Sequence, residues 1–289
     1  MLHRSPVDIA WEIILANPSG TAEIELRTIF SEGEEDYMLH LGFTALHKAA
    51  VGLYQIDIAD YIRNHPQDFV NKVDNLGRTP VSYAASRNEI ANLTALLDGG
   101  ADISIGDHLL VLPIHNAASI GNAAALEKLL AAGAAVDAVT SKGHSALHEA
   151  VAAGSVDSVR LLLKHGAQCD TADALGRQPL YFAATLGHPE MVPILVQHGA
   201  DVNAKRFNNS TALMEAFYLR RDDVARALVS FGANVDCIRG FTDCMSHTVD
   251  DCTCRALKEE LQRLETAARA CPLPDSTDSD IFEDALEQL

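Results

Sequence analysis

A glycine–alanine step recurs every 33 residues along the middle of this 289-residue chain. It occurs five times, at Gly100-Ala101, Gly133-Ala134, Gly166-Ala167, Gly199-Ala200 and Gly232-Ala233. A four-residue segment runs in phase with it, and its six copies begin at Thr44, Thr79, Leu112, Ser145, Gln178 and Thr211. Two series that share one period indicate a chain built from a single structural unit repeated about six times.

Each unit predicts two helices joined by a turn and followed by an extended loop. The four-residue segment usually begins with Thr or Ser and continues with Pro or Ala, which is typical of the start of a helix. A second apolar run follows, and Leu126, Leu129 and Leu130 show the i, i+3, i+4 spacing of one helix face. The glycine after that run, as at Gly133, suits a left-handed helix end.

These units resemble the ankyrin repeat. The stretches GHSALHEAVAAGSVDSVRLLLKHGAQCD and GRQPLYFAATLGHPEMVPILVQHGADVN follow the consensus of that family almost position by position. The resemblance covers residues 42–239, and the chain is also similar to divergent ankyrin proteins of filamentous fungi. It implies an all-α solenoid with helical caps at both ends, and binding of another protein as the usual role. Leu110-Val111-Leu112 departs from the consensus, and so do two extra residues near Pro66-Gln67.

We expect the repeats to be flanked by terminal segments of different character. Residues 1–41 predict an N-terminal helical cap, because a solenoid exposes apolar faces at its ends. The expected repeats within 42–239 are 42–76, 77–109, 110–142, 143–175, 176–208 and 209–239. Residues 240–271 predict a cysteine-rich loop and a helix over about 253–270 with one apolar stripe. This helix is expected to be a cap, and the alternative is a free amphipathic helix that docks on a partner.

The last segment, residues 272–289, has six acidic residues and no basic residue. Such a composition predicts a disordered tail. The alternative is a short helix that docks in a groove through Ile281, Phe282, Leu286 and Leu289.

The charge of the chain narrows the classes of partner. It has 40 acidic and 22 basic residues, and its formal net charge is −18. Nucleic acids and anionic membranes are bound through Lys and Arg, so we expect neither as a partner. A protein with a basic surface is favoured, because opposite charges speed association.

The cysteines and the early apolar stretches indicate an intracellular location, either cytoplasmic or nuclear. The six cysteines lack the dense, regular spacing of small secreted disulfide folds. The most apolar early stretch, residues 9–16, is short and contains Glu12, so it is a poor signal core or membrane span.

The residue that follows each four-residue segment is expected to face a concave groove, together with residues one helical turn further on. Binding faces favour aromatic anchors among a few polar groups. We expect the strip to centre on Tyr83, Glu149, Phe182 and Tyr218, although some members of it could pack against neighbouring units instead. The full set is Lys48, Tyr83, Ser86, Asn116, Ser119, Glu149, Phe182, Thr185, Glu215 and Tyr218.

The loop tips between units are expected to extend this binding surface. The candidates there are Arg78, His144, Arg177, Arg206, Phe207 and Arg239. By contrast, His47, His115 and His148 occupy the last position of the four-residue segment, where members of the family use histidine to hydrogen-bond neighbouring loops. We therefore expect a structural role for these three histidines.

A cluster of soft metal ligands follows the last repeat. Zinc takes about four such ligands, and a cap without a large core gains stability from a metal. The spacing C-x6-C-x2-H-x4-C-x-C matches no standard zinc motif, so free thiols are the alternative to a structural zinc site. The cluster consists of Cys237, Cys244, His247, Cys252 and Cys254.

Taken together, these features favour a non-catalytic scaffold that binds a protein through the groove and the loop tips. The alternative is a groove recruited to bind or convert a small molecule, as in an acid/base isomerase or cyclase. No catalytic residue is predicted. Glu149 and Glu215 lie two units apart, about 16–20 Å at the spacing of packed helices, whereas paired catalytic carboxylates of glycosidases lie about 5–10 Å apart. A pocket of about 300 Å³ or more would favour the small-molecule alternative.

Overall fold

The computed structural model describes residues 42–52, 56–65, 70–87 and 90–235, together with Gln262, Arg263 and Thr266. The predicted N-terminal cap and the acidic tail lie outside the described residues, and so does the segment 240–271 apart from those three positions.

Twelve helices follow one another in residues 45–230, where the described positions contain no strand. The first helices of the units are α4 (Ala45–Ala50), α6 (Pro80–Ala85), α8 (Pro113–Ser119), α10 (Ala146–Ala152), α12 (Pro179–Leu186) and α14 (Ala212–Tyr218). The second helices are α5 (Ile58–Asn64), α7 (Ile90–Asp98), α9 (Ala123–Ala131), α11 (Val156–Lys164), α13 (Met191–Gln197) and α15 (Asp222–Ser230).

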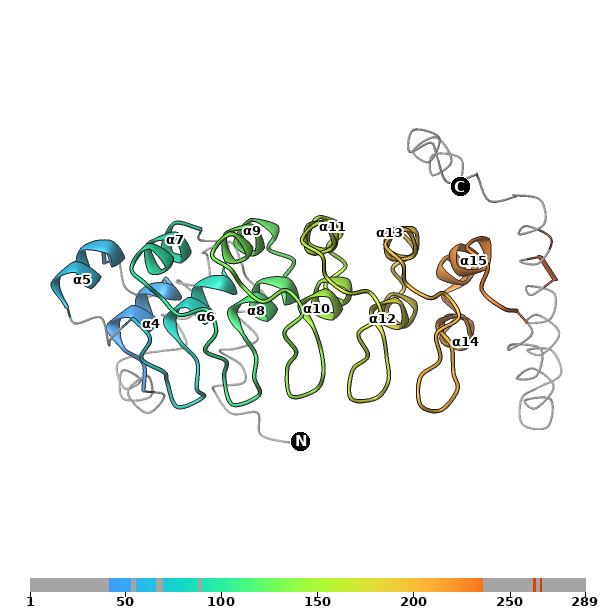
Figure 1. Cartoon of the computed structure of the whole chain (residues 1–289), viewed down its shortest axis with the longest axis horizontal. Coiled ribbons are helices and arrows are strands. Elements are labelled where there is room, and N and C mark those ends of the chain that lie inside the picture. Colours follow the sequence, from blue (N-terminus) through green and yellow to red (C-terminus); the bar gives the residue numbers. More distant parts are fainter. Residues whose placement is uncertain are drawn as a thin grey trace, which may run out of the picture.

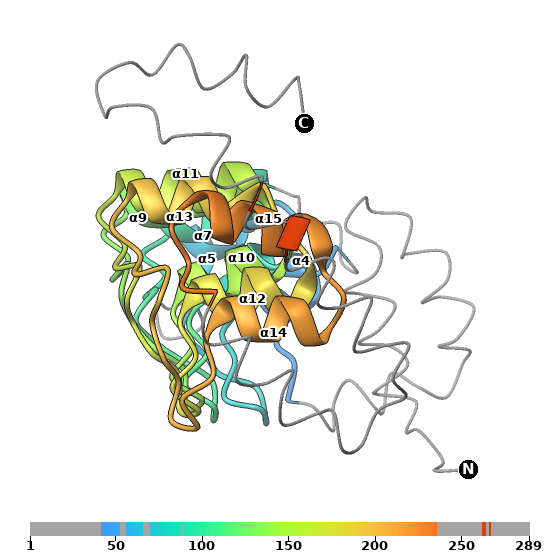
Figure 2. The same cartoon turned by 90° about the vertical axis from the view of Figure 1, so that its right-hand side faces the viewer.

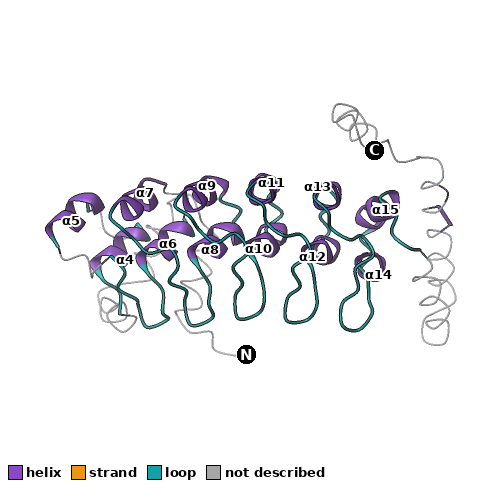
Figure 3. Cartoon of the chain, viewed as in Figure 1, coloured by secondary structure: helices purple, strands orange, loops and turns teal. Residues whose placement is uncertain are grey.

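The helices form two parallel rows, one of first helices and one of second helices (Figure 1). Long loops connect each second helix to the next first helix, and they all leave the helical layers on the same side (Figure 3). Each first helix packs against the first helix of the next unit, and from α6 onward it also packs against its own second helix. The predicted all-α solenoid of helix, turn, helix and loop is confirmed.

Small residues in the first helices allow this close stacking. The alanine pairs 84–85, 117–118 and 183–184 are fully buried between neighbouring units. Leucines of the second helices, such as Leu126, Leu129 and Leu162, fill the space between the two rows. The core is therefore one continuous apolar layer along the stack, to which every unit contributes a thin slice.

Three buried histidines join each of their units to the following loop. The Nδ1 atom of His115 accepts a hydrogen bond from the backbone N–H of Leu112 at 3.0 Å, and its Nε2–H donates to the carbonyl of Ala138 at 2.8 Å. His47 and His148 make the equivalent pair of bonds, with Nε2–H donating to the carbonyl oxygens of Arg78 and Arg177. The expected structural role of these histidines is confirmed.

Burial keeps these histidines neutral. Burial lowers the pKa of His47 and His115, and it lowers the pKa of His148 to about 4. The hydrogen bond of His148 to the carbonyl of Arg177 raises this pKa, but by less than burial lowers it. A neutral ring is the form that both bonds need, because Nδ1 must accept a hydrogen bond while Nε2 carries the proton that it donates.

Three of the loops each contain a buried aspartate that accepts hydrogen bonds from the backbone of the same loop. Asp74, Asp107 and Asp173 each accept hydrogen bonds at Oδ1 from the backbone N–H groups two and four residues further on, at 2.8–2.9 Å. Their exposed fractions are at most 6%. Each carboxylate satisfies backbone donors that would otherwise be buried without a partner, so the loop is held in one conformation.

Neighbouring loop tips also touch one another. The backbone N–H of Ser141 donates to the carbonyl of Leu109 at 2.8 Å, and that of Ala174 donates to the carbonyl of Lys142 at 2.9 Å. Gly143 lies at this contact with a φ of +79°, and a Cβ atom added there would lie 2.8 Å from the nitrogen of Ala174. Glycine is therefore required at this tip for two reasons, its left-handed backbone and the proximity of the next loop.

Candidate partner-binding face

The first helices and the long loops meet at an angle along the whole stack, and together they bound one face of the molecule (Figure 2). Side chains from both parts converge where they meet. This is the face to which the sequence assigned the concave groove.

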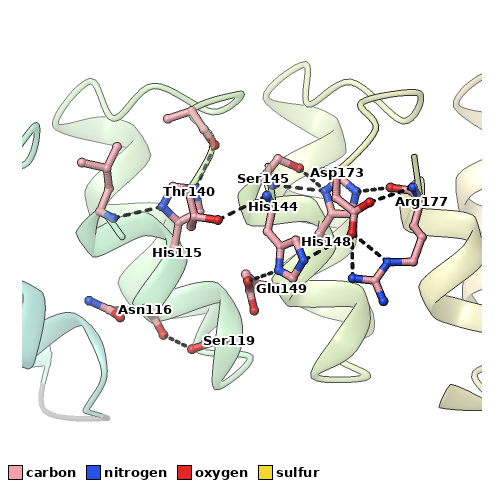
Figure 4. A network of polar contacts seen from close by, with 12 residues as sticks. His115, Asn116, Ser119, Thr140, His144, Ser145, His148, Glu149, Asp173 and Arg177 are labelled. Carbon is pink, nitrogen blue, oxygen red and sulfur yellow. Dashed lines mark hydrogen bonds and ion pairs between the residues drawn. The ribbon is translucent and has the colours of Figure 1, made fainter. Parts of the chain in front are cut away.

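A polar network crosses this face between the units that contain α10 and α12 (Figure 4). His144 lies between two carboxylates, with Nδ1 2.9 Å from Oε1 of Glu149 and Nε2 3.5 Å from Oδ2 of Asp173. Asp173 also accepts two bonds of 2.7 Å from the guanidinium of Arg177. The network ties a groove residue, Glu149, to two loop residues, His144 and Arg177, which the sequence had assigned separately.

The aromatic ring of Phe182 packs against the same network. It lies edge-on to the rings of His144 and His148, with centroid distances of 5.2 and 5.3 Å. The guanidinium of Arg177 lies 4.7 Å from the ring centroid, a cation–π geometry. Phe182 is therefore half-buried and fixed in place rather than free in the groove.

Asp173 is an anion at neutral pH. Burial alone would raise its pKa, but the side chain and backbone of Arg177 and the backbone N–H of Leu175 hold that pKa below the usual value. The charge is compensated inside the network, so this face presents donors and acceptors in fixed positions.

A second network joins the last two described units. The hydroxyl of Tyr181 donates to Oε2 of Glu215 at 2.5 Å and accepts a bond of 2.9 Å from the guanidinium of Arg206. Burial and the bond to Glu215 raise the pKa of Tyr181. The sequence placed Glu215 and Arg206 in the binding surface but gave no signal that Tyr181, a residue of the helix-start segment, would join them.

A small cavity lies beside this second network. It is lined by Gln178, Tyr181, Lys205 and Arg206, among others, and encloses about 10 Å³. That volume has room for about one water molecule. It is far below the volume of about 300 Å³ at which small-molecule sites begin.

Two predicted groove residues are wrong. Tyr83 is only 2% exposed, because its hydroxyl donates to Oδ2 of Asp74 at 2.6 Å and its ring lies against Phe43 and His47. Ser86 is also buried, and its hydroxyl donates to the carbonyl of Tyr83 at 2.8 Å. Both residues therefore belong to the core of the second unit rather than to a binding face.

The remaining predicted groove residues are half-buried or exposed. Lys48, Asn116, Glu149, Thr185 and Glu215 are half-buried, and Ser119 is exposed. Tyr218, at the end of α14, is 63% exposed. The first unit and the third to sixth units thus carry the accessible part of the strip, and the second unit does not.

The predicted loop residues differ in their surroundings. Arg78 forms an ion pair of 3.3 Å with Asp107 of the next loop, whereas the side chain of Phe207 is 79% exposed. Arg239 and the cluster of Cys237, Cys244, His247, Cys252 and Cys254 lie outside the described residues, so the zinc site stays a prediction. Within the part of the chain that the structure describes, no group of three or more His, Cys, Asp or Glu side chains is arranged to hold a metal ion.

In the described residues, no helix is both long and apolar enough to cross a membrane.

Comparison with known proteins gives one family. A model described as ankyrin repeats (3 copies) matches residues 114–206 and, in a second match, residues 169–239. These matches begin in α8 and extend past α15, so they include both polar networks. A search of curated proteins found no match.

Proposed function

We propose that this chain, which belongs to the ankyrin-repeat proteins, is a non-catalytic scaffold. Ankyrin repeats are generally protein–protein interaction modules. The chain binds its protein partner through the face between its first helices and its loops. The proposed contact residues are Lys48, Asn116, Ser119, Glu149, Phe182, Thr185, Glu215 and Tyr218 on the helices, with Arg78, His144, Arg177, Arg206 and Phe207 on the loops.

The observation that carries this proposal is the exposure of two large aromatic side chains on a face whose polar side chains are held by hydrogen bonds and ion pairs. Tyr218 and Phe207 are 63% and 79% exposed. Aromatic residues of this kind supply the anchors of protein interfaces, because they bury a large area for few rotatable bonds.

The two polar networks support the same proposal by lowering the cost of binding. An interface loses free energy for every flexible side chain that it must order. Here Glu149 and Glu215 are already held by His144 and Tyr181, at 2.9 and 2.5 Å. A partner therefore meets acceptors whose positions are set before it arrives.

We propose that the partner presents a basic surface. Residues 90–235 contain 14 acidic and 10 basic residues, a net charge of −4, whereas the whole chain carries −18. The difference of −14 belongs to residues outside this part of the stack. The electrostatic field of this negative net charge attracts a basic protein to the chain. Glu149 and Glu215 then supply carboxylates at the contact itself.

Comparative capture from an extract of the source cells tests the proposal. The wild-type chain, a Phe182→Ala/Tyr218→Ala variant and an Arg160→Ala/Lys164→Ala control would each be immobilised and their bound proteins identified by mass spectrometry. The control residues are exposed on α11, in the second row of helices. We expect a protein that the wild type and the control retain and the groove variant loses.

The purified partner would then be titrated against all three chains. Loss of the Tyr218 anchor together with the half-buried ring of Phe182 should weaken binding by at least about 30-fold, since one hot-spot residue alone contributes about 2 kcal/mol or more. A partner that binds the groove variant as tightly as the wild type would show that this face is not the interface.

A further inference from the structure

The tips of four neighbouring loops form a surface with an unusual composition. This loop-tip row consists of residues 108–110, 141–143, 174–176 and 207–209, and its loops hang side by side below the first helices in Figure 1. Leu109, Leu110, Leu175 and Phe207 are each more than half exposed on it. The row contains no acidic residue, Lys142 lies on it, and Lys205 and Arg206 lie next to it. The buried neighbours Asp107 and Asp173 are paired with Arg78 and Arg177, so these ion pairs leave the row its basic character.

The row is also held at a fixed spacing. Ser141 and Ala174 are hydrogen-bonded to the preceding tips at 2.8 and 2.9 Å. The ring of Phe207 lies 3.0 Å from the position that a Cβ atom of Gly176 would occupy. The exposed apolar side chains thus sit on a rigid edge and not on independently moving loops.

Leu110 provides an independent sign that this edge is used for contact. Its φ is +58°, in the left-handed region, and the equivalent positions of the next three loops are Gly143, Gly176 and Asn209. A leucine is disfavoured in that conformation, whereas glycine and asparagine adopt it readily. Leu110 is 59% exposed, so burial compensates little of this strain. The loop needs the left-handed conformation, which recurs at all four positions, but it does not need a leucine side chain there, and this supports a role of the side chain in binding.

We propose that residues 278–289 at the C-terminus of the same chain dock on the loop-tip row. The composition of this segment is complementary to that of the row. Residues 272–289 hold six acidic residues and no basic one, and four apolar residues lie among them, Ile281, Phe282, Leu286 and Leu289. An acidic segment with apolar anchors satisfies both properties of the row, its exposed leucine and phenylalanine side chains and its positive charge.

The spacing of the anchors also fits. On a helix, Phe282, Leu286 and Leu289 lie at i, i+4 and i+7 and share one face. Phe282 and Leu289 are then about 10 Å apart along the axis, at 1.5 Å per residue. Packed helices of adjacent units are about 8–10 Å apart. The two anchors therefore match two adjacent tips, such as those of Leu175 and Phe207.

The length of chain between the stack and the segment permits this contact. Forty-two residues separate Val235 from Asp278. Even a fully helical connection of that length spans about 60 Å, several times the distance between adjacent tips. Because the segment is tethered, its effective concentration at the row is in the range of about 1 mM, so a weak contact is enough to occupy the row.

This inference goes beyond the proposed function, because it assigns an intramolecular occupant and a means of regulation. A docked segment covers Phe207 and the neighbouring tips. A basic partner competes for the carboxylates of the segment and so uncovers the row. Binding of the partner and release of the segment are then linked equilibria.

Zero-length cross-linking of the full chain with a carbodiimide tests the assignment. The reagent joins a lysine amine to a carboxylate only where the two are in contact. We expect links from Lys142 and Lys205 to the acidic residues of 278–287. Lys128 and Lys164 serve as internal controls, because they are exposed on the second row of helices, on the side opposite the tips in Figure 1.

A Leu175→Ser/Phe207→Ser variant should lower the yield of these links by at least about fivefold, since it removes two apolar anchors. A Leu186→Ser variant is the matched control, because Leu186 is exposed at the end of α12 and outside the row. Urea unfolding of both variants would verify that the stack remains folded.

Three results would overturn the inference. They are links from Lys128 and Lys164 at the same yield as from Lys142 and Lys205, an absence of links to Lys142 and Lys205 in the wild type, and an unchanged yield in the double variant. A mixture of isotope-labelled and unlabelled chains adds a fourth. Links formed mainly between chains would show that the occupant is a second copy. These outcomes are measured on the chain without a partner. Phe207 belongs to both surfaces, and the capture experiment tests partner binding separately through Phe182 and Tyr218.

Discussion

Gly133 and Gly143 form a matched pair that separates two reasons why a glycine with a left-handed backbone recurs in this chain. Both have a left-handed backbone, with φ values of +89° and +79°. A Cβ atom added to Gly133 meets nothing within 4 Å, whereas one added to Gly143 meets backbone atoms of Asp173 and Ala174 at 2.8–3.0 Å. The two positions thus share the conformational requirement and differ in the proximity of a neighbour.

We expect Gly133→Ala to lower the free energy of unfolding by about 1 kcal/mol, the cost of a left-handed alanine. Gly143→Ala should cost that amount and a further 1–3 kcal/mol or so, because rigid backbone must shift to accept the methyl group. The shift also disturbs the bond from Ala174 to the carbonyl of Lys142.

Urea unfolding followed by circular dichroism would measure both differences under one set of conditions. The midpoint of Gly143→Ala should lie clearly below that of Gly133→Ala, and both should lie below the wild type. Equal losses in the two variants would refute the claim that contact between adjacent loop tips contributes to stability, and would leave only the backbone requirement.

Three further predictions concern burial, pH and metal. His148 has a pKa of about 4 when folded, below its unfolded value, so the unfolded chain binds the extra proton first and stability falls as the pH drops from about 6.5 toward 4. At pH 5 this loss is about 2 kcal/mol relative to pH 7, and His148→Gln should flatten that part of a stability profile measured by urea unfolding at each pH. Asp173→Asn should lower the free energy of unfolding by about 2 kcal/mol, because it weakens a buried acceptor of four bonds. The control Asp102→Asn, at an exposed turn, should lower it by less than about 0.5 kcal/mol. Equal losses would contradict the proposed role of the buried carboxylate. The predicted zinc site implies about one zinc per chain in protein purified without chelator, measured by inductively coupled plasma mass spectrometry, and metal-free protein would favour free thiols.

The sequence predicted the fold well because the periodic residues act locally. Gly133, the alanine pairs and His115 have their effect within one unit or between a unit and its neighbour, and the period repeats that neighbour at a known distance. The role of His115 was predictable for this reason, and its bonds to Leu112 and Ala138 agree with it.

The candidate site was predicted less well, because exposure depends on what else lies against a position. Tyr83 and Phe182 occupy equivalent places in their units, yet Tyr83 is buried and bonded to Asp74 whereas Phe182 borders the polar network. Periodicity identifies the face of a helix and not the side chains that cover it. The sequence also contains a periodic signal for the acceptors inside the loops. Asp74, Asp107 and Asp173 recur at multiples of 33 residues, and that recurrence marks the buried acceptors of the loops.

The histidine bonds run in one direction along the stack, and this has a consequence for how the protein can be shortened. His47 and His148 each use a carbonyl of the next unit, that of Arg78 and that of Arg177, whereas His115 uses the carbonyl of Ala138 in the loop of its own unit. A chain that ends just after the unit of His47 or of His148 lacks the carbonyl acceptor of a buried ring nitrogen, so such a deletion destabilises the unit that remains before it. A chain cut ahead of such a unit removes no acceptor from the histidines that remain. Deletions from the two ends should therefore be unequally tolerated. The series of histidine bonds ends with His148 in the fourth unit, because the fifth and sixth units have Tyr181 and Met214 in place of the histidine.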